Sequence, residues 1–325
     1  MIGDPEALAE SLVSGSFHRP EMVSTLTEMA GRGETPNEVA VLAKAFRRAA
    51  VPVRTSHSVV LDLCGTGGAP FRTFNVSSIA SFIVSSLGVP VAKHGNRSSR
   101  GCGSADLFES LGARLALSPD EAGTFLDDLG FTFLFAPSFH PAMRHAVPVR
   151  KEISTRTVFN MLGPLLNPVE ARRRQLIGVY SPRLLDLFPP VLAAMGVERA
   201  LIVHGRPGMD EVSVIGTTTA VLADGESRER FLIDPRAMGL YHPVSDDVSE
   251  LTPAMSAEAA RKILGGQVGA RRDMVVLNAA CGLLAYGAVK DLDLGVRRCE
   301  ATIDSGKALA RMNEYIARTN RRIVS

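Results

Sequence analysis

The chain has 325 residues, 46% of them apolar, which allows one large domain or a large domain with a smaller one. Lys and Arg number 36 against 34 Asp and Glu, a formal net charge of +2, which argues against a surface built to bind nucleic acid or a membrane. No apolar run reaches the length of a membrane span, no secretory signal opens the chain, and the four cysteines form no CxxC pair. We therefore expect a cytoplasmic protein with reduced thiols.

The first fifty residues are predicted to form short helices. Asp4-Pro5-Glu6 is an N-cap followed by proline at the first helical position. Thr35-Pro36-Asn37-Glu38 repeats the signal, with glutamate at the capping-box position. No strand-like run appears before residue 58. Residues 1–56 are therefore expected to form a small helical domain.

From residue 58 onward, strand-like and helix-like runs alternate. Strands are predicted over 59–63, 89–92, 131–135, 175–180 and 199–204, and helices over 77–87, 105–111, 118–130 and 183–195. This alternation is typical of crossover units in a mostly parallel sheet. A later hairpin is expected from 219–222 and 229–233 at the sheet edge, and the last seventy residues are expected to be helical. The fold class is α/β: a small N-terminal helical domain plus a larger α/β domain, residues 57–325, with a mostly parallel central sheet flanked by helices.

The segment 139–168 is rich in proline and is predicted to be irregular, apart from a short helix over 143–152. A connector this long in a compact chain is usually functional. Part of it is expected to cross to the small helical domain and join it.

Glycine and hydroxyl residues follow the first strand of the sheet. Gly65-Thr66-Gly67-Gly68 comes directly after it, and glycine lets backbone amides approach a ligand closely. Asn75-Val76-Ser77-Ser78 opens the next helix, where hydroxyls and the helix N-terminus suit a phosphate. When each motif is read alone, an ordinary tight turn explains the first as well as a binding role does, and a helix cap explains the second somewhat better.

Polar residues also follow the second strand. Lys93-His94-Gly95-Asn96-Arg97 lies at the carboxyl end of an apolar run, which is where open α/β sheets bind ligands. Lys93 and Arg97 are candidates to neutralise phosphate charge, and His94 and Asn96 are candidates to hydrogen-bond a ribose or an aromatic substrate. A solvated turn is the alternative. The motifs together predict an enzyme that handles a multiply phosphorylated small molecule.

Two further features bear on chemistry. Asp210-Glu211 follows a strand on a glycine-containing loop, and adjacent carboxylates suit a hard cation such as Mg²⁺ held partly through water. A surface acidic pair is the alternative, and Arg150 taken alone reads as a surface charge. The sequence shows no metal-ligand spacing of histidines and no serine nucleophile elbow. No covalent or strong-base catalytic residue is therefore expected.

These segments together resemble the anthranilate phosphoribosyltransferase family. The matching blocks occur in the family's order and are 65–68, 75–78, 93–97, 103–106, 140–143, 156–168 and 210–211. The resemblance implies transfer of the phosphoribosyl group of PRPP (5-phosphoribosyl 1-pyrophosphate) to anthranilate, giving N-(5-phosphoribosyl)anthranilate and pyrophosphate, in tryptophan biosynthesis. It also implies use of Mg²⁺, a homodimer, and a fold shared with pyrimidine nucleoside phosphorylases.

The resemblance carries site residues with it. Substrate binding would fall to Gly65, Gly68, Thr73, Asn75, Val76, Ser77, Ser78, Lys93, His94, Gly95, Asn96, Arg97, Ser99, Ser104 and Arg150. Asn96 and Arg150 would contact anthranilate. The metal ions would be served by Ser77, Asp210 and Glu211.

The chain departs from the family pattern in three places. Ala69 stands where the family usually has aspartate, which predicts an unusual Mg²⁺ dependence. The loop 97–103 is one residue shorter than the usual serine-rich loop, and the helical region that usually forms the dimer interface is somewhat short. Two alternatives stay open: an enzyme like the pyrimidine nucleoside phosphorylases, and a non-catalytic relative that binds nucleic acid. The near-neutral charge disfavours the second.

Overall fold

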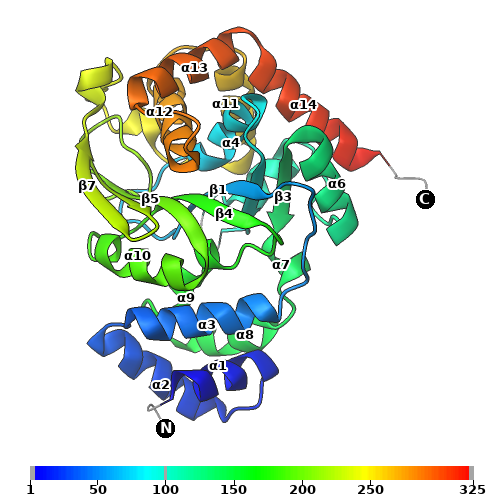
Figure 1. Cartoon of the computed structure of the whole chain (residues 1–325), viewed down its shortest axis with the longest axis vertical. Helices are drawn as coiled ribbons and strands as arrows, with labels where there is room; N and C mark the ends of the chain where they lie inside the picture. Colours follow the sequence, from blue (N-terminus) through cyan, green and yellow to red (C-terminus); the bar gives the residue numbers. More distant parts are fainter. Residues whose placement is uncertain (1–3, 99–100, 322–325) are drawn as a thin grey trace.

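A seven-stranded sheet forms the middle layer of the molecule in the computed structural model, which describes residues 4–98 and 101–321 (Figure 1). The strand order is β3-β2-β1-β4-β5-β6-β7. Five strands are parallel: β1 (Val59–Gly65), β2 (Val91–Gly95), β3 (Phe131–Phe135), β4 (Arg172–Gly178) and β5 (Val197–Gly205). The antiparallel hairpin of β6 (Thr218–Asp224) and β7 (Ser227–Ile233) ends the sheet, as predicted.

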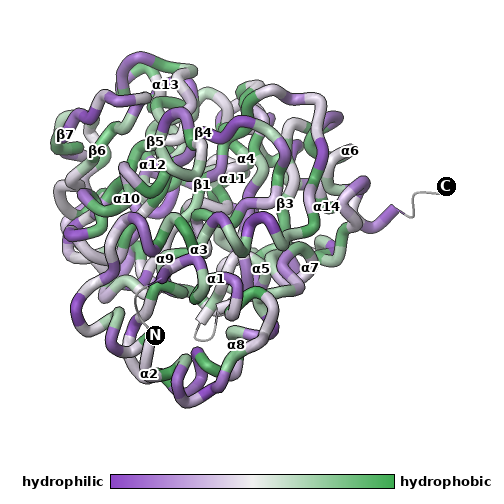
Figure 2. The backbone as a smooth tube through the Cα atoms, turned by 60° about the horizontal axis from the view of Figure 1, so that its bottom comes forward, coloured by the Kyte–Doolittle hydropathy of each residue, from purple (hydrophilic) through white to green (hydrophobic). Residues whose placement is uncertain are grey.

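Helices cover both faces of this sheet (Figure 1). On one side lie α4 (Val76–Ser86), α11 (Pro253–Leu264), α12 (Ala270–Tyr286), α13 (Leu292–Asp304) and α14 (Lys307–Asn320). Helices α5 (Ser104–Ser110) and α6 (Pro119–Leu129) follow β2, and α6 packs on β3. On the other side α10 (Leu184–Ala194) packs on β5 and on α3. Figure 2 shows hydrophobic residues along the strands and α12, while outer helices such as α2 and α14 alternate in hydropathy.

The N-terminal helices form a further layer below α10 (Figure 1). They are α1 (Pro5–Ser14), α2 (Arg19–Arg32) and α3 (Pro36–Arg48). Asp4 caps α1, and Thr35 with Glu38 forms a complete capping box on α3, which confirms both predicted helix starts. One apolar cluster runs from Leu12 and Phe46 of this layer to Ile177 and Ile202 of the sheet. The division into domains 1–56 and 57–325 stays a prediction.

The connector 139–168 is more helical than predicted. The helix α8 occupies Met143–Glu152, as expected, and it packs against α1 and α2. Before it in the chain comes α7 (Ala136–Phe139), and after it come α9 (Phe159–Leu162) and the 3-10 turn η1 (Gly163–Leu165). These pieces are only three or four residues long, so the 3.6-residue period of apolar positions cannot reveal them.

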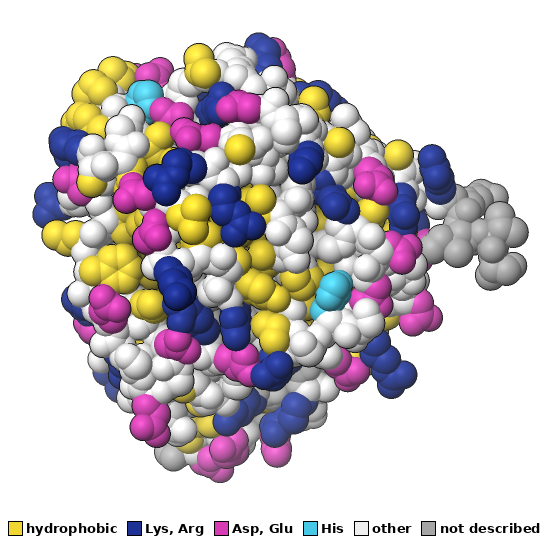
Figure 3. All heavy atoms as spheres, turned by 45° about the horizontal axis from the view of Figure 1, so that its top comes forward, with side chains coloured by type: hydrophobic (Ala, Val, Ile, Leu, Met, Phe, Trp, Pro, Cys, Tyr) yellow, Lys and Arg dark blue, Asp and Glu magenta, His cyan; other side chains and the backbone are white. Residues whose placement is uncertain are grey.

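The remaining 3-10 turns, η2 (Pro235–Met238) and η3 (Asp246–Val248), lie between the hairpin and α11. On the face drawn in Figure 3, basic and acidic side chains are interspersed. Among the described residues, no helix combines the length and the apolar character needed to cross a membrane.

Candidate active site

The carboxyl ends of the parallel strands open on one cavity of about 920 Å³. Parallel strands end at the same edge of a sheet, so segments far apart in the sequence meet there. The cavity is lined by residues 64–69 after β1, 93–98 on and after β2, 102–104 before α5, and 210–211 after β5. Residues 72–75 and 77–78, several residues within 136–150 and 159–166, and Glu250 supply the remaining walls. All the blocks that carried the prediction therefore border one space.

The glycine loop after β1 is shaped around Asp210. Gly67 and Gly68 both have φ near +70°, a conformation that favours glycine. The Gly67 N–H donates to Asp210 Oδ2 at 2.7 Å, and a Cβ on Gly65 would lie 2.7 Å from the same oxygen. At the end of β4, a Cβ on Gly178 would overlap the Asp210 backbone carbonyl. Because Gly65 and Gly178 have no side chains, the glycine loop can contact the turn that carries Asp210.

Arg156 holds the far side of this glycine loop. Its guanidinium donates to the Gly68 carbonyl and lies over the Tyr180 ring, 4.5 Å from the centroid. Ala69, where the family usually has aspartate, is buried and lines the cavity. The loop is thus fixed by Arg156 and Asp210 without a carboxylate at position 69.

Lys93 is a buried cation on β2 that reaches the cavity. Its Nζ donates to the Leu63 carbonyl at 2.6 Å and to Ser77 Oγ at 3.2 Å. Burial lowers the pKa of Lys93 and raises that of the fully buried Asp62, while each partner's charge opposes the shift. Asn167 donates to Asp62 Oδ2 at 3.0 Å and holds that carboxylate in place. The strand β2 includes Lys93 to Gly95, which the sequence placed just after the end of the strand.

Asp210 and Glu211 bring two carboxylates to the cavity. Burial raises the pKa of both, and with the charge of Asp210 it raises the pKa of Glu211 to about 8, while hydrogen bonding to Ser77 acts in the opposite direction. Within residues 4–98 and 101–321, no group of three or more His, Cys, Asp or Glu could hold a metal. Two carboxylates suit Mg²⁺, which keeps water and takes substrate phosphates as its other ligands.

A pair of histidines also lines the cavity. His94 Nδ1 faces the Gly163 carbonyl at 3.3 Å, and His94 Nε2 lies 3.2 Å from His140 Nε2. Burial lowers the pKa of His94 to about 3 and that of His140 to about 4, so both rings are neutral near pH 7. Because a carbonyl only accepts, His94 Nδ1 carries the proton and His140 donates to His94 Nε2.

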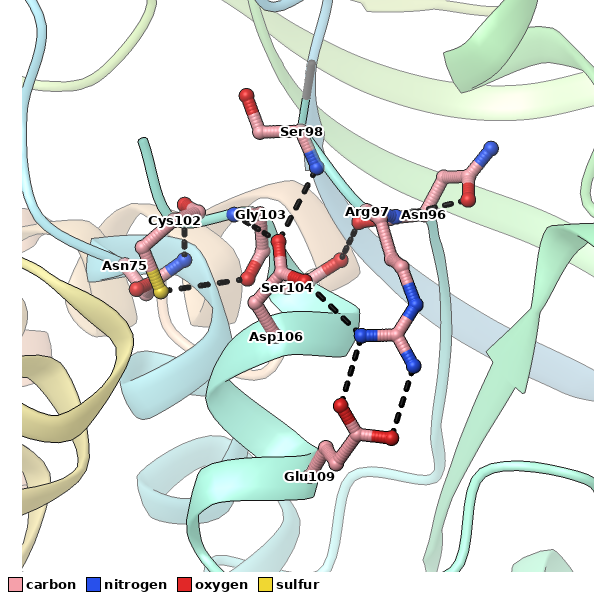
Figure 4. A network of polar contacts seen from close by, with 9 residues as sticks. All are labelled: Asn75, Asn96, Arg97, Ser98, Cys102, Gly103, Ser104, Asp106 and Glu109. Carbon is pink, nitrogen blue, oxygen red and sulfur yellow. Dashed lines mark hydrogen bonds and ion pairs between the residues drawn. The ribbon is translucent and has the colours of Figure 1, made fainter. Parts of the chain in front are cut away.

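The arginines singled out from the sequence have different surroundings. Arg150 on α8 lines the cavity, with its guanidinium 5.4 Å from the centroid of the Phe159 ring. Arg97 also lines the cavity, but its guanidinium binds Glu109 at 2.7 and 2.8 Å and Asp106 at 3.1 Å (Figure 4). The guanidinium of Arg97 is therefore already paired with two carboxylates, which a phosphate would have to displace.

Most of the predicted site residues border the cavity. They are Gly65, Gly68, Thr73, Asn75, Ser77, Ser78, Lys93, His94, Gly95, Asn96, Arg97, Ser104, Arg150, Asp210 and Glu211. Val76 is fully buried at the start of α4 and is not among the lining residues. Ser99 lies outside the described residues. The individual binding roles of these residues stay predictions.

Sequence reasoning assigned no role to several other lining residues. They are Arg72, His140, Met143, Asn160 and Glu250. Arg72 and Glu250 form an ion pair at 2.8 Å that joins the segment before α4 to the segment before α11. A pairing between such distant segments leaves no local pattern. His140 and Met143 belong to a block that matched the family, which was the only available signal.

The α/β fold brings a glycine loop, a lysine and two carboxylates together at its strand ends. A model described as the glycosyl transferase family, a/b domain, matches residues 57–309, which places the chain in the class of glycosyltransferases. The anthranilate phosphoribosyltransferase of Pelotomaculum thermopropionicum is 44% identical over 95% of this chain and 90% of its own length. That of Rubrobacter xylanophilus is 41% identical over 99% of this chain and 94% of its own length. The chain belongs to the anthranilate phosphoribosyltransferase family.

Solved structures agree with this placement. The anthranilate phosphoribosyltransferase of Thermus thermophilus superposes with a TM-score of 0.91 at 37% identity, covering 99% of this chain and 96% of that one. The enzyme from Saccharomyces cerevisiae in complex with PRPP and Mg gives a TM-score of 0.88 at 28% identity, over 97% of this chain and 93% of that one. The predicted fold class is confirmed.

Proposed function

We propose that this chain transfers the phosphoribosyl group of PRPP to anthranilate, releasing pyrophosphate, as a step of tryptophan biosynthesis. The observation that carries the proposal is the convergence on one cavity of the glycine loop, Lys93 and the carboxylates Asp210 and Glu211. Glycine amides and a lysine suit phosphate oxygens, and paired carboxylates suit Mg²⁺ bound to a polyphosphate. Membership of the family supports the same substrates.

The residues divide the chemistry between them. The amine of anthranilate is already a nucleophile, so the protein's tasks are to neutralise the departing pyrophosphate and to align the amine with C1 of the ribose. Lys93, the amides of the glycine loop and the hydroxyls of Ser77 and Ser78 would hold the phosphates. Asp210 and Glu211 would hold Mg²⁺, which when bound neutralises phosphate charge. Arg150 and Asn96 would orient anthranilate.

We propose three further properties from the family pattern and the composition. The chain acts as a homodimer, its α1–α3 layer with α8 forms a helical domain separate from the α/β domain, and the enzyme is cytoplasmic. Light scattering on the purified protein tests the first. A mass corresponding to one chain at micromolar concentration would count against the dimer.

The activity itself has a direct assay. Purified protein with PRPP, Mg²⁺ and anthranilate should consume anthranilate, seen as loss of its fluorescence, and should release pyrophosphate in equal amount. Phosphorolysis of thymidine or uridine, without use of anthranilate, would favour the nucleoside phosphorylase alternative instead. Binding of random DNA at physiological salt by an inactive protein would favour the non-catalytic one.

A further inference from the structure

A carboxylate on α5 ties together the two ends of the segment that borders the cavity between β2 and α5 (Figure 4). Asp106 Oδ2 accepts from the Ser98 N–H at 3.2 Å and from the Gly103 N–H at 2.8 Å. Its Oδ1 accepts from Arg97 at 3.1 Å. One side chain thus satisfies backbone donors on both sides of the loop and contacts the cation that precedes it.

Glu109 completes this arrangement one turn along α5. Its two oxygens accept from the two terminal nitrogens of Arg97 at 2.7 and 2.8 Å, the parallel geometry that makes arginine–carboxylate pairs strong. Burial does not account for the contact, because the side chain of Glu109 is 57% exposed. We call Arg97, Asp106 and Glu109 the α5 clamp. Isolated exposed pairs contribute little, but a bidentate pair inside a network is the exception.

The clamp bears on two residues that border the cavity. The Asn96 carbonyl accepts from the Ala105 N–H at 3.2 Å and from Ser104 Oγ at 3.4 Å. A Cβ on Gly103 would lie 2.6 Å from the same carbonyl, so the strand end and the start of α5 are in tight contact. This contact therefore helps to fix the positions of Asn96 and Ser104.

We propose that Glu109 is a positioning residue for PRPP binding. It is not among the residues that line the cavity, and it acts through Arg97, which it holds against α5 so that Ser104 faces PRPP while Asn96 faces anthranilate. The proposal rests on the proposed function, because it takes PRPP as the ligand. It also assigns Arg97 to the clamp instead of to a phosphate.

The test compares Glu109→Gln, Arg97→Gln and the double variant with the parent protein. Glu198→Gln is the matched control, since Glu198 pairs with Arg172 at 2.8 Å at the opposite, N-terminal ends of β4 and β5. We expect each single variant to weaken PRPP binding in calorimetry by about tenfold, kcat to change by less than about threefold, and the double variant to be no worse than either single one. The control should bind PRPP as the parent does.

Two binding results would overturn the proposal. Tighter PRPP binding by Glu109→Gln would mean that Glu109 withholds Arg97 from a phosphate. Additive losses in the double variant would mean that the two residues act independently. A purely structural role would lower stability in Glu109→Gln and Glu198→Gln alike without moving the affinity for PRPP.

A second readout separates this proposal from the proposed function. In the ligand-free protein, amide hydrogen exchange at Ser98 and Gly103 should be faster in Glu109→Gln than in the parent or in the control. Unchanged amide exchange at Ser98 and Gly103 would overturn the proposed role of the α5 clamp, whether or not the protein has transferase activity. If the parent protein binds PRPP but does not use anthranilate, the proposed function fails while the affinities still test Glu109. If it does not bind PRPP at all, hydrogen exchange alone decides.

Discussion

Arg150 lines the cavity, and within residues 4–98 and 101–321 no carboxylate pairs with its guanidinium, in contrast to Arg97. We therefore expect it to meet the carboxylate of anthranilate. Arg150→Ala should lower kcat/KM for anthranilate by the equivalent of about 2–3 kcal/mol, the value of a charged hydrogen bond, with much less effect on KM for PRPP. Steady-state kinetics with each substrate varied in turn measure both. Lys151→Ala, which removes the neighbouring charge on α8, should change neither. Equal losses for the two substrates would show that Arg150 is structural.

At position 69, this chain has alanine and so lacks the carboxylate charge that the family usually has there. The glycine loop is held by Arg156 and Asp210, so we expect the enzyme to be active without a carboxylate at this position. Ala69→Asp should add a charge beside Mg²⁺-bound phosphate and shift the Mg²⁺ concentration for half-maximal rate or the KM for PRPP. Ala69→Asn has nearly the same shape and no charge, and its Mg²⁺ curve should follow the parent. Superimposable curves for all three proteins would make position 69 neutral.

At the scale of the element, the turn after β5 depends on glycines of the neighbouring strands. It fits because Gly65 and Gly178 have no side chains where Asp210 lies. Asp210→Asn with Glu211→Gln should abolish turnover or raise the Mg²⁺ requirement severalfold. Because burial raises the pKa of both acids, their charges are unfavourable without a cation, so Tm should not fall.

The exposed pair Asp246 and Asp247, changed to asparagine, is the control for this variant and should leave the Mg²⁺ titration unchanged. If the double variant of Asp210 and Glu211 had parental activity at every Mg²⁺ concentration, the two carboxylates would not bind the Mg²⁺ that catalysis uses.

Elements with strong local signals were predictable from the sequence. The Thr35 and Ser118 caps, the strand Phe131–Phe135 and the helix Met143–Glu152 were all found where the residues indicated. The start of β4 was missed because it opens with three arginines. Arg173 is buried there only because the carbonyls of Leu165 and Met195 accept its hydrogen bonds. Likewise no local pattern reveals that Arg97 meets Glu109, or that Gly178 makes room for Asp210.

At the scale of the whole molecule, the neutral histidine pair links stability to pH. The pKa values of His94 and His140, about 3 and about 4, lie below the ordinary 6.5, so the unfolded chain binds more protons at mildly acidic pH. The contribution of the two histidines to the free energy of unfolding is therefore fully present above about pH 6.5 and is lost as the pH falls. Asp210 and Glu211 change the pH dependence of stability in the opposite direction, because burial raises their pKa values. The contribution of the histidines is therefore measured as the difference in stability loss between a variant and the parent protein.

Urea unfolding at about pH 7.5 and about pH 5.5 measures this difference. From the higher to the lower pH, the free energy of unfolding should fall less in His140→Gln than in the parent, by about 1 kcal/mol. His18→Gln, which removes an exposed histidine, should match the parent. An identical loss in all three proteins would mean that the buried pair is not neutral in the folded state.

The central claim is that one cavity at the carboxyl ends of the strands holds PRPP, and the most direct measurement is a crystal structure of this protein with PRPP and Mg²⁺. We predict the pyrophosphate on the glycine loop 65–68 beside Lys93, a Mg²⁺ ion between it and Asp210 or Glu211, and C1 of the ribose facing the wall that carries Arg150. PRPP bound elsewhere, or in this cavity with its pyrophosphate away from Lys93 and both carboxylates, would contradict the account.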